Sequence, residues 1–434
     1  MNNLAGKVMY QMSLRTMNAK GTLKACEELL PHVKSLGVDI VYVCPFFVQD
    51  DDMDKEVWSI RQKASGCENP KNPYKIADYF NIDEEYGTNE DFESFVKSAH
   101  SIGLEVMLDL VYLHCSRNAV FIKDNPDFVE REEDGSVKVG ARWPFARLNY
   151  SNPKLREYMY SHMEYLIKRF DIDGYRCDVG DAVPLDFWRE GVLRVKKIKP
   201  DFRMLNEGSD PEYPKEVFDS NYMFRKRVLI RGYLTGDSSK KDLIEYLESG
   251  FDFRNSISHL DNHDTVTDDK GKLEVRIGTD KMSAAHVLIY TIGGTPFLWN
   301  GAEVCDENEN NMFSNRFYGR RNSIDWSGSF TEKGQKRTKL LVDLANLYHF
   351  EKALVYGETK YIGDVEDNGL MCYERCLENE SIFVYINFSS ENRSVESMLP
   401  EGDFDVLLTE STGFDGESVV LEPNGYIIVK RTEQ

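Results

Sequence analysis

The chain has 434 residues, of which 41% are hydrophobic and 29% charged, enough for one large domain with its own core and an accessory domain. Its formal net charge of −21 disfavours nucleic acid and anionic membranes as partners, because both are polyanions, and it disfavours an anionic substrate unless a local basic patch overrules it. No apolar run has the length of a signal-peptide core or a membrane span, so the sequence predicts a cytoplasmic protein.

Short apolar runs alternate with helical patterns over the first 350 residues. Strands are predicted at 8–14, 38–44, 106–111, 174–179, 202–205, 257–260 and 295–299, and a poorly marked sixth strand lies near residue 222. Helices are predicted over 22–36, from Thr88, where Asp91 nearly completes a capping box, and from Asn152 to about Phe170. Strands that alternate with helices form parallel βα units. The pattern therefore predicts an α/β protein whose residues 1–350 form a (β/α)8 TIM barrel.

Two segments break this alternation. The stretch from 114 to 150 carries Pro, Gly and charge runs, so residues 115–150 are predicted to form a short inserted lobe after the third strand. Beyond residue 350 the pattern changes to short strands at 354–361, 369–373, 382–386, 404–408 and 426–429. This predicts a C-terminal antiparallel β-sandwich domain over 351–434.

Polar side chains stand at the ends of several predicted barrel strands. Because the carboxyl ends of parallel barrel strands meet at one face, these side chains are expected to converge. They are Asp109 and His114 after the third strand, Arg176 and Asp178 on the fourth, Glu207 after the fifth, and Asn262, His263 and Asp264 after the seventh.

This set of residues suits a retaining glycosidase, which needs one carboxylate as nucleophile and one carboxylic acid as proton donor. Arg176 lies two residues before Asp178 and so on the same face of the strand, where its charge would keep Asp178 ionised. Glu207 has no basic residue within three positions, which is compatible with a raised pKa and an acid role. Taken singly, each of these residues is as well explained by a loop cap or a structural ion pair. An alternative interpretation is that Asp109, His114 and Glu207 bind zinc or manganese, but their spacing matches no metal motif.

The order of these motifs resembles the alpha-amylase superfamily of glycoside hydrolases, family 13, and in particular its small intracellular members that degrade maltooligosaccharides. Four segments carry the resemblance over nearly the whole chain: DLVYLH at 109–114, GYRCDV at 174–179, LNEG at 205–208 and HLDNHD at 259–264. Two flanking segments, PYKIADYFNIDEEYGT at 73–88 and GTPFLWNGAE at 294–303, are also similar to the family's.

The resemblance implies a role for each residue at the predicted site. Asp178 would be the nucleophile, Glu207 the general acid/base and Asp264 the third carboxylate, which binds sugar hydroxyls and stabilises the transition state. Tyr74 would stack on the sugar at the cleaved bond. The remaining residues that would contact or brace that sugar are Asp109, His114, Arg176 and His263.

Departures from the family pattern bear on calcium. The residue before His114 is Leu113, where the family often has an asparagine that helps to bind calcium, and the loop at 15–22 lacks acidic residues. No cofactor is therefore expected to be required, and the two departures argue against a calcium ion. The acidic run at 50–54 is read as a solvated loop rather than a cation site.

The predicted function is hydrolysis of alpha-glucosidic bonds in maltooligosaccharides, with an oligosaccharide as the only partner and no indication of oligomeric state. Residues 145–149, FARLN, are similar to a short motif of neopullulanases and cyclomaltodextrinases. A transglycosylase, sucrose phosphorylase or isomerase would use the same nucleophile, so these alternatives stay open. A non-catalytic relative that serves as a binding or chaperone subunit is disfavoured, because all three carboxylates are present.

Overall fold

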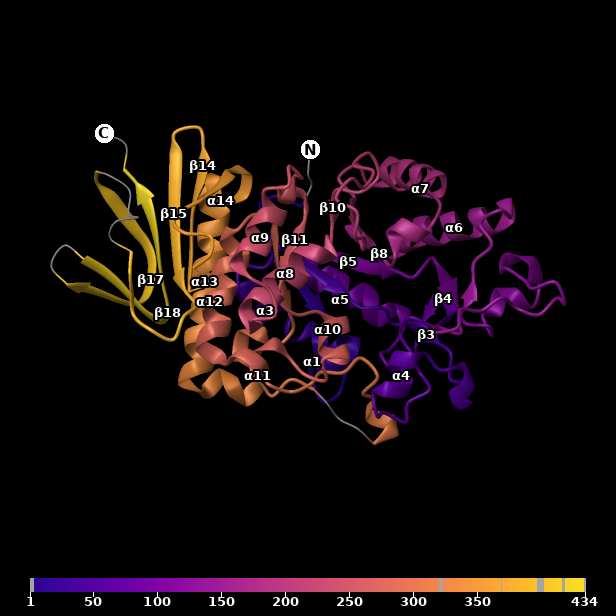
Figure 1. Ribbon diagram of the computed structural model, residues 1–434. Coiled ribbons are helices and arrows are strands. Elements are labelled where there is room, and N and C mark those ends of the chain that lie inside the picture. Colours follow the sequence, from indigo (N-terminus) through magenta and orange to yellow (C-terminus); the bar gives the residue numbers. More distant parts are fainter. Residues whose placement is uncertain (1–3, 320–322, 368, 396–401, 416–417, 433–434) are drawn as a thin grey trace.

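The computed structural model describes residues 4–319, 323–367, 369–395, 402–415 and 418–432 (Figure 1). Eight parallel strands follow one another around a sheet in chain order. A parallel bridge between Asn221 and Ser256 joins the two ends of this sheet, so the sheet closes into the predicted (β/α)8 barrel. Its strands are β1 (Met9–Met12), β2 (Ile40–Val43), β5 (Glu105–Leu110), β8 (Gly174–Cys177), β9 (Arg203–Asn206), β10 (Ser220–Asn221), β11 (Ile257–His259) and β12 (Thr295–Trp299).

The alternation of side chains along these strands builds two layers of core. Met9, Ile40, Met107 and Phe297 belong to a cluster that fills the barrel interior. Their strand neighbours, such as Val41, pack outward in the main core with the surrounding helices. Because both faces of each strand are buried, the strands appear in the sequence as continuous apolar runs rather than as alternating patterns.

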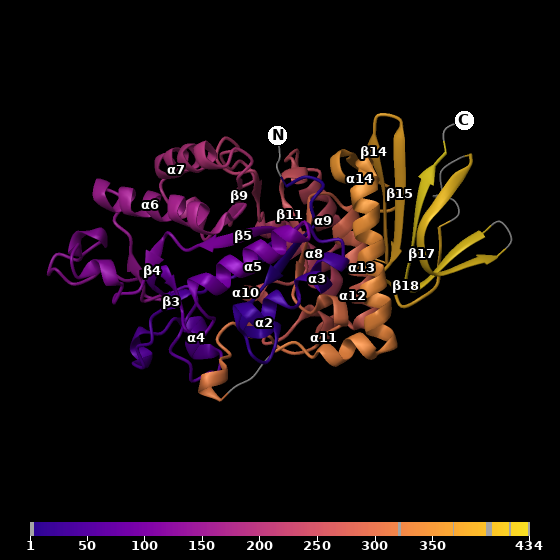
Figure 2. The same ribbon diagram turned by 180° about the vertical axis from the view of Figure 1, so that it is seen from behind.

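Helices cover the outside of the barrel (Figures 1 and 2). They are α1 (Leu14–Met17), α2 (Leu23–Glu27), α3 (Leu30–Ser35), α4 (Ile60–Ala64), α5 (Asn89–Ser101), α6 (Pro153–Phe170), α7 (Leu185–Ile198), α8 (Phe224–Thr235), α9 (Lys240–Leu247), α10 (His263–Asp268), α11 (Leu273–Ile277), α12 (Thr279–Thr291), α13 (Glu332–Phe350) and α14 (Lys352–Tyr356). None of the helices in the described part of the chain is long and apolar enough to cross a membrane.

Two helix predictions are confirmed and one is wrong. The capping box of Thr88 and Asp91 opens α5, and Asn152 caps α6, which ends at Phe170 as expected. The single helix predicted over 22–36 is instead two helices, α2 and α3. Pro31 lies in the first turn of α3 and has no backbone N–H to donate, so it favours the start of a second helix over the continuation of the first.

Two small sheets stand at the end of the barrel where the strands finish. The chain between β5 and α6 forms the predicted inserted lobe, in which β6 (His114–Cys115) pairs with β7 (Ala146–Arg147). The connection between β2 and α5 forms β3 (Phe47–Gln49) and β4 (Ile76–Ile82), also an antiparallel pair. The backbone N–H of Ser116 donates to the carbonyl of Ile76, so the two small sheets are linked.

The C-terminal part forms one antiparallel sheet that lies against α12, α13 and α14 (Figures 1 and 2). One face, with Tyr373 and Ile386, shares the main core with the barrel. On the other face, Leu421 and Val429 from the two ends of the last strand share a second core, so the sheet curls over itself as a β-sandwich. Its strands are β13 (Glu358–Tyr361), β14 (Leu370–Leu377), β15 (Glu380–Asn387), β16 (Arg393–Ser394), β17 (Phe404–Asp415) and β18 (Ser418–Arg431).

The strand predicted over 354–361 is wrong in its first half, where residues 352–356 form α14. Ala353, Leu354 and Val355 are all buried, and a short run of buried residues has no periodicity that separates a helix from a strand.

Candidate active site

Arg176 on β8 joins three carboxylates that come from three neighbouring strands. Its side chain is fully buried, and its Nη1 donates to both oxygens of Asp109, at 2.7 and 2.9 Å, and to Oδ1 of Asp178 at 2.9 Å. Its Nη2 lies 2.6 Å from Oε1 of Glu207 in an ion pair. The structure thus brings together four of the predicted site residues, at the carboxyl ends of β5, β8 and β9.

Tyr74 and His263 lie on the opposite side of Asp109. The Tyr74 hydroxyl is 2.9 Å from Oδ2 of Asp109 and 2.6 Å from Nε2 of His263, and the two rings are stacked at 5.3 Å with planes 14° apart. The Gln11 amide nitrogen donates to Nδ1 of His263, which leaves Nε2 as the donor to Tyr74, and the Tyr74 hydroxyl then donates to Asp109. Burial lowers the pKa of His263 to about 4, so the ring is neutral in this chain of hydrogen bonds.

His114 is placed behind Tyr74. Its Nε2 donates to the backbone carbonyl of Tyr74 at 2.9 Å, and its ring packs on Phe145 at 4.7 Å. Burial lowers the pKa of His114 to about 4, which keeps this ring neutral as well. His114 therefore fixes the position of Tyr74 in the absence of a bound sugar.

Asp264 lies at the start of α10 and is held by a residue that sequence reasoning missed. Arg61 on α4 contacts Oδ1 of Asp264 and binds both oxygens of Asp268, at 2.7 and 2.9 Å. Burial would raise the pKa of Asp264, but the charges of neighbouring groups, Arg61 and Arg176 among them, outweigh it and lower the pKa, which keeps this carboxylate ionised. Nothing in the sequence around Arg61 marks it, because its partners lie more than 200 residues away.

Asp178 and Glu207 titrate as a pair. Burial, and then the charge of Glu207, raise the pKa of Asp178 well above its ordinary value, although Arg176 opposes this. Burial also raises the pKa of Glu207. The site therefore favours a proton on one of the two carboxyl groups over two anions. The prediction that Arg176 keeps Asp178 ionised is wrong for the free enzyme, since Arg176 divides its charge among Asp109, Asp178 and Glu207.

Comparison with known protein families bears on the function of this group of side chains. The sequence profile described as "Alpha amylase, catalytic domain" matches residues 9–134 and 142–340, which is most of the chain. The chain belongs to the alpha-amylase family. The resemblance that the four motifs indicated is thereby confirmed.

Similar proteins fall in the same family. The alpha-amylase MalA of Haloarcula japonica is 26% identical over 91% of this chain, and the maltogenic alpha-amylase of Bacillus acidopullulyticus is 24% identical over 86%. This chain spans 57% and 63% of the length of these two proteins. The crystal structure of a noncanonic maltogenic alpha-amylase, AmyB of Thermotoga neapolitana, superposes with a TM-score of 0.81 at 23% identity and covers 100% of both chains.

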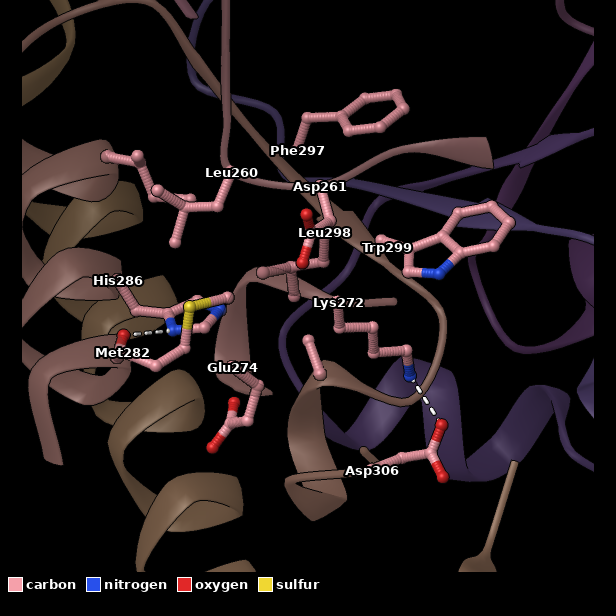
Figure 3. A pocket seen from close by; sticks show the side chains of 12 residues that line it. Leu260, Asp261, Lys272, Glu274, Met282, His286, Phe297, Leu298, Trp299 and Asp306 are labelled. Atoms are coloured by element: carbon pink, nitrogen blue, oxygen red, sulfur yellow. Dashed lines mark hydrogen bonds and ion pairs between the residues drawn. The ribbon is translucent and has the colours of Figure 1, made fainter. Parts of the chain in front are cut away.

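A large cavity adjoins the site of this family member. It has a volume of about 610 Å³ and is lined by Asp264, Arg61 and one side of α8 along its whole length. A second pocket, between β12 and α12, is shown in Figure 3. It measures only about 10 Å³, room for about one water molecule, and the ion pair of Lys272 with Asp306 at 2.5 Å lies at its edge. Of these two, the first cavity has the volume to accommodate sugar units.

The residues of the acidic run at 50–54 do not fit a calcium ion. Asp50 is buried, and the Lys75 ammonium lies 3.3 Å from its Oδ2, where a cation would have to bind. Ser116 and Asn118 also donate to the same carboxylate oxygen. Within the described ranges, no three His, Cys, Asp or Glu side chains gather as a metal site.

Proposed function

We propose that this alpha-amylase family member is a cytoplasmic retaining hydrolase of alpha-glucosidic bonds in maltooligosaccharides or short alpha-glucans. The observation that carries the proposal is the pair of buried carboxyl groups, Asp178 and Glu207, that share one guanidinium and favour a single proton between them. A retaining glycosidase needs one carboxylate anion and one carboxylic acid on either side of the bond that it cleaves. Two relatives that are named alpha-amylase and maltogenic alpha-amylase support this substrate class.

In the first step of the proposed mechanism, the single proton lies on Glu207, so Asp178 attacks the anomeric carbon as the anion and Glu207 gives its proton to the departing glycosidic oxygen. The product is a glucosyl ester of Asp178. Glu207 is oriented for this transfer, because the backbone N–H of Val179 donates to its Oε2 at 2.8 Å while Arg176 holds Oε1.

The second step requires Glu207 to become a base. Esterification removes the negative charge of Asp178 beside Glu207, and the loss of a neighbouring anion lowers the pKa of Glu207. Arg176 and the Val179 N–H then stabilise the Glu207 carboxylate, which takes a proton from the attacking water. Water breaks the ester and releases the sugar with its original anomeric configuration.

The remaining residues bind and orient the sugar. Asp264, kept ionised by its cationic neighbours, would bind two sugar hydroxyls. Tyr74 would present the free face of its ring to the apolar face of the sugar, and His114 and His263 would donate to sugar hydroxyls. Asp109 holds Arg176 and Tyr74 in place, so it acts as a positioning residue.

The test is the time course of products from maltoheptaose in phosphate-free buffer. The native protein should release short maltooligosaccharides or glucose, and Asp178→Ala should lower kcat/KM by a factor of about 10⁴ or more. Asp186→Ala, which removes an exposed carboxylate of α7, is the matched control and should behave as the native protein does.

Two other outcomes are informative. Products longer than maltoheptaose would indicate that a sugar rather than water breaks the ester, as in a transglycosylase. Equal activity of the native protein and Asp178→Ala would contradict the assignment of the nucleophile. Complete inactivity toward maltoheptaose, isomaltose and sucrose with phosphate would contradict the proposed function as a whole.

A further inference from the structure

The third carboxylate of the site, Asp264, is bound by an arginine that lies outside the family motifs. Nη1 of Arg61 donates to Oδ1 of Asp264, while Nε and Nη2 donate to the two oxygens of Asp268, at 2.7 and 2.9 Å. Asp264 and Asp268 lie one helical turn apart on α10, so one guanidinium spans both carboxylates. Arg61 is therefore held in a fixed orientation beside Asp264.

The helix that carries Arg61 is itself fixed on both sides. The Ser59 side chain caps α4 by accepting from the N–H of Gln62. The Gln62 side chain is buried, and its amide nitrogen donates to two backbone carbonyls of the following loop, at 2.8 and 2.9 Å. The N–H of Ile60 donates to the carbonyl of Arg142 in the inserted lobe. The position of Arg61 is thus built into the fold.

Arg61 keeps two N–H donors that the described residues do not use. A guanidinium has five N–H donors, and the contacts with the aspartates use one each on Nε, Nη1 and Nη2. Within the same residues, Oδ2 of Asp264 accepts no hydrogen bond. The side chains of Arg61 and Asp264 are 26% and 21% exposed, and both line the cavity of about 610 Å³. A ligand at this wall meets free donors and a free acceptor side by side.

This pair of side chains stands next to the carboxyl groups that would react. Besides burial, the charge of Asp264 helps to raise the pKa of both Asp178 and Glu207. A glucose that presents its anomeric carbon to Asp178 has hydroxyls on neighbouring ring carbons, whose oxygens are about one hydrogen-bond length apart. An anion beside a cation matches such hydroxyls, because they can donate to the carboxylate while one of them accepts from the guanidinium.

We propose that Arg61 is a substrate-binding residue, which recognises neighbouring hydroxyl groups of the sugar at the cleaved bond together with Asp264. The inference rests on the proposed function, because Asp264 is the third carboxylate of that function. It deepens the function by assigning selectivity for the hydroxyl pattern of the sugar to one side chain. Sugars in which one of these hydroxyls is missing or substituted are then poor substrates. Asp268 anchors the guanidinium and takes no part in the contact.

Hydrolysis of maltoheptaose by variants of Arg61 is the first measurement. Arg61→Gln should lower kcat/KM by about 10- to 100-fold, the usual effect of losing a hydrogen bond to a charged group. Arg61→Lys should lose less, because it keeps the charge but not the planar set of donors. Lys63→Gln removes one positive charge at an exposed position of the same helix, so it is the matched control and should act as the native protein does. Equal kcat/KM of the native protein and Arg61→Gln would overturn the proposal.

Deoxy sugars separate contact with the substrate from an effect through the charge of Asp264. The substrates are p-nitrophenyl α-maltoside and its 2-deoxy, 3-deoxy and 6-deoxy analogues in the glucose that carries the nitrophenyl group, because release of p-nitrophenol reports that glucose at the cleaved bond. For a ring hydroxyl that Arg61 binds, Arg61→Gln and removal of the hydroxyl should not be additive. They should be additive for the 6-deoxy control. The same loss in Arg61→Gln for every analogue would overturn the proposal.

The opposite sign of effect has a definite meaning. A KM that is lower in Arg61→Gln than in the native protein would mean that Arg61 competes with the sugar for Asp264, and it would overturn the proposal. Additive losses in an enzyme that cleaves maltoheptaose would remove Arg61 from the substrate site and leave the proposed hydrolase intact. Inactivity of the native protein toward both kinds of substrate would instead contradict the proposed function, and this inference with it.

Discussion

Arg176 shows how much of this site depends on a single side chain. It is fully buried, and carboxylates of Asp109, Asp178 and Glu207 surround it. One cation among three anions leaves an excess of negative charge, and the site relieves it by holding a proton between Asp178 and Glu207. The proton that the acid step requires is therefore retained by the charge balance of the site.

Glu207→Gln tests this charge balance through stability. The folded-state pKa of Glu207 is raised above its usual 4.5, so the folded protein binds more protons than the unfolded chain. This contribution to stability is full below the unfolded pKa and is lost as the pH rises through the folded pKa. A neutral glutamine has no such loss. The free energy of unfolding of Glu207→Gln relative to the native protein should therefore increase from about pH 5 to about pH 8, by less than about 1.4 kcal/mol for each unit by which the folded pKa exceeds the unfolded pKa, because part of the proton release lies below pH 5.

Urea unfolding at the two pH values measures the difference. Glu216→Gln is the control, because Glu216 is exposed and its pKa is lowered by a hydrogen bond from Arg189. It should show no increase with pH. A difference between Glu207→Gln and the native protein that shrinks as the pH rises would mean that the folded pKa of Glu207 is not raised.

The sequence alone predicts that side chains at strand ends belong to the site. It does not predict this for side chains that reach the site from across the barrel. Asp109, Arg176 and Asp178 are placed by the strands that carry them, so their convergence follows from the fold. Gln11 and Arg61 take part through contacts with residues about 200 or more positions away. No local pattern encodes such a contact, and only the folded chain reveals it.

At the scale of elements, α5 depends on its first turn. The Thr88 side chain accepts from the N–H of Asp91, and the Asp91 carboxylate accepts from the N–H of Thr88. Thr88→Ala leaves one of these amides without its partner and should lower the free energy of unfolding by about 1 kcal/mol. Ser101→Ala, an exposed position in the last turn of the same helix, should change it by less than about 0.5 kcal/mol. Equal losses in the two variants, measured by urea unfolding, would contradict a role for the cap.

The boundaries of helices and strands are predictable from the sequence where a capping residue or a proline marks them. They are not predictable where only tertiary packing determines whether a buried segment forms a helix or a strand. Asn152 and Pro153 define the start of α6 in the sequence itself. Residues 353–355 are buried on a helix because they pack between α13 and β14, a contact with residues distant from them in the barrel and the sheet. The apolar run alone is equally compatible with a strand.

At the scale of the whole molecule, the barrel and the C-terminal sheet share one core. We keep the division into 1–350 and 351–434 as a proposal about domains, but expect the two to unfold together. All five tryptophans, at positions 58, 143, 188, 299 and 326, belong to the first part, so tryptophan fluorescence reports on the barrel. Ile386 belongs to β15 and is buried in the shared core.

Ile386→Ala should lower the barrel's stability by about 2 to 5 kcal/mol, because it opens a cavity in that shared core. The measurement is the midpoint of urea unfolding followed by tryptophan fluorescence. Val406→Ala, at an exposed position of β17, should leave the midpoint unchanged. A midpoint unaffected by Ile386→Ala would show that the C-terminal sheet unfolds on its own.

The junction that closes the barrel has a mechanical consequence. Elsewhere the barrel strands are joined by two to four residue pairs, but β10 and β11 meet only through the bridge of Asn221 with Ser256. The Lys226 ammonium reinforces this junction by donating to the hydroxyls of Ser256 and Ser258. Transient opening of the barrel should therefore occur first between β10 and β11, where α8 borders the large cavity. The strands that carry Arg176 and its carboxylates are joined by four residue pairs each, so they should stay paired when this junction opens.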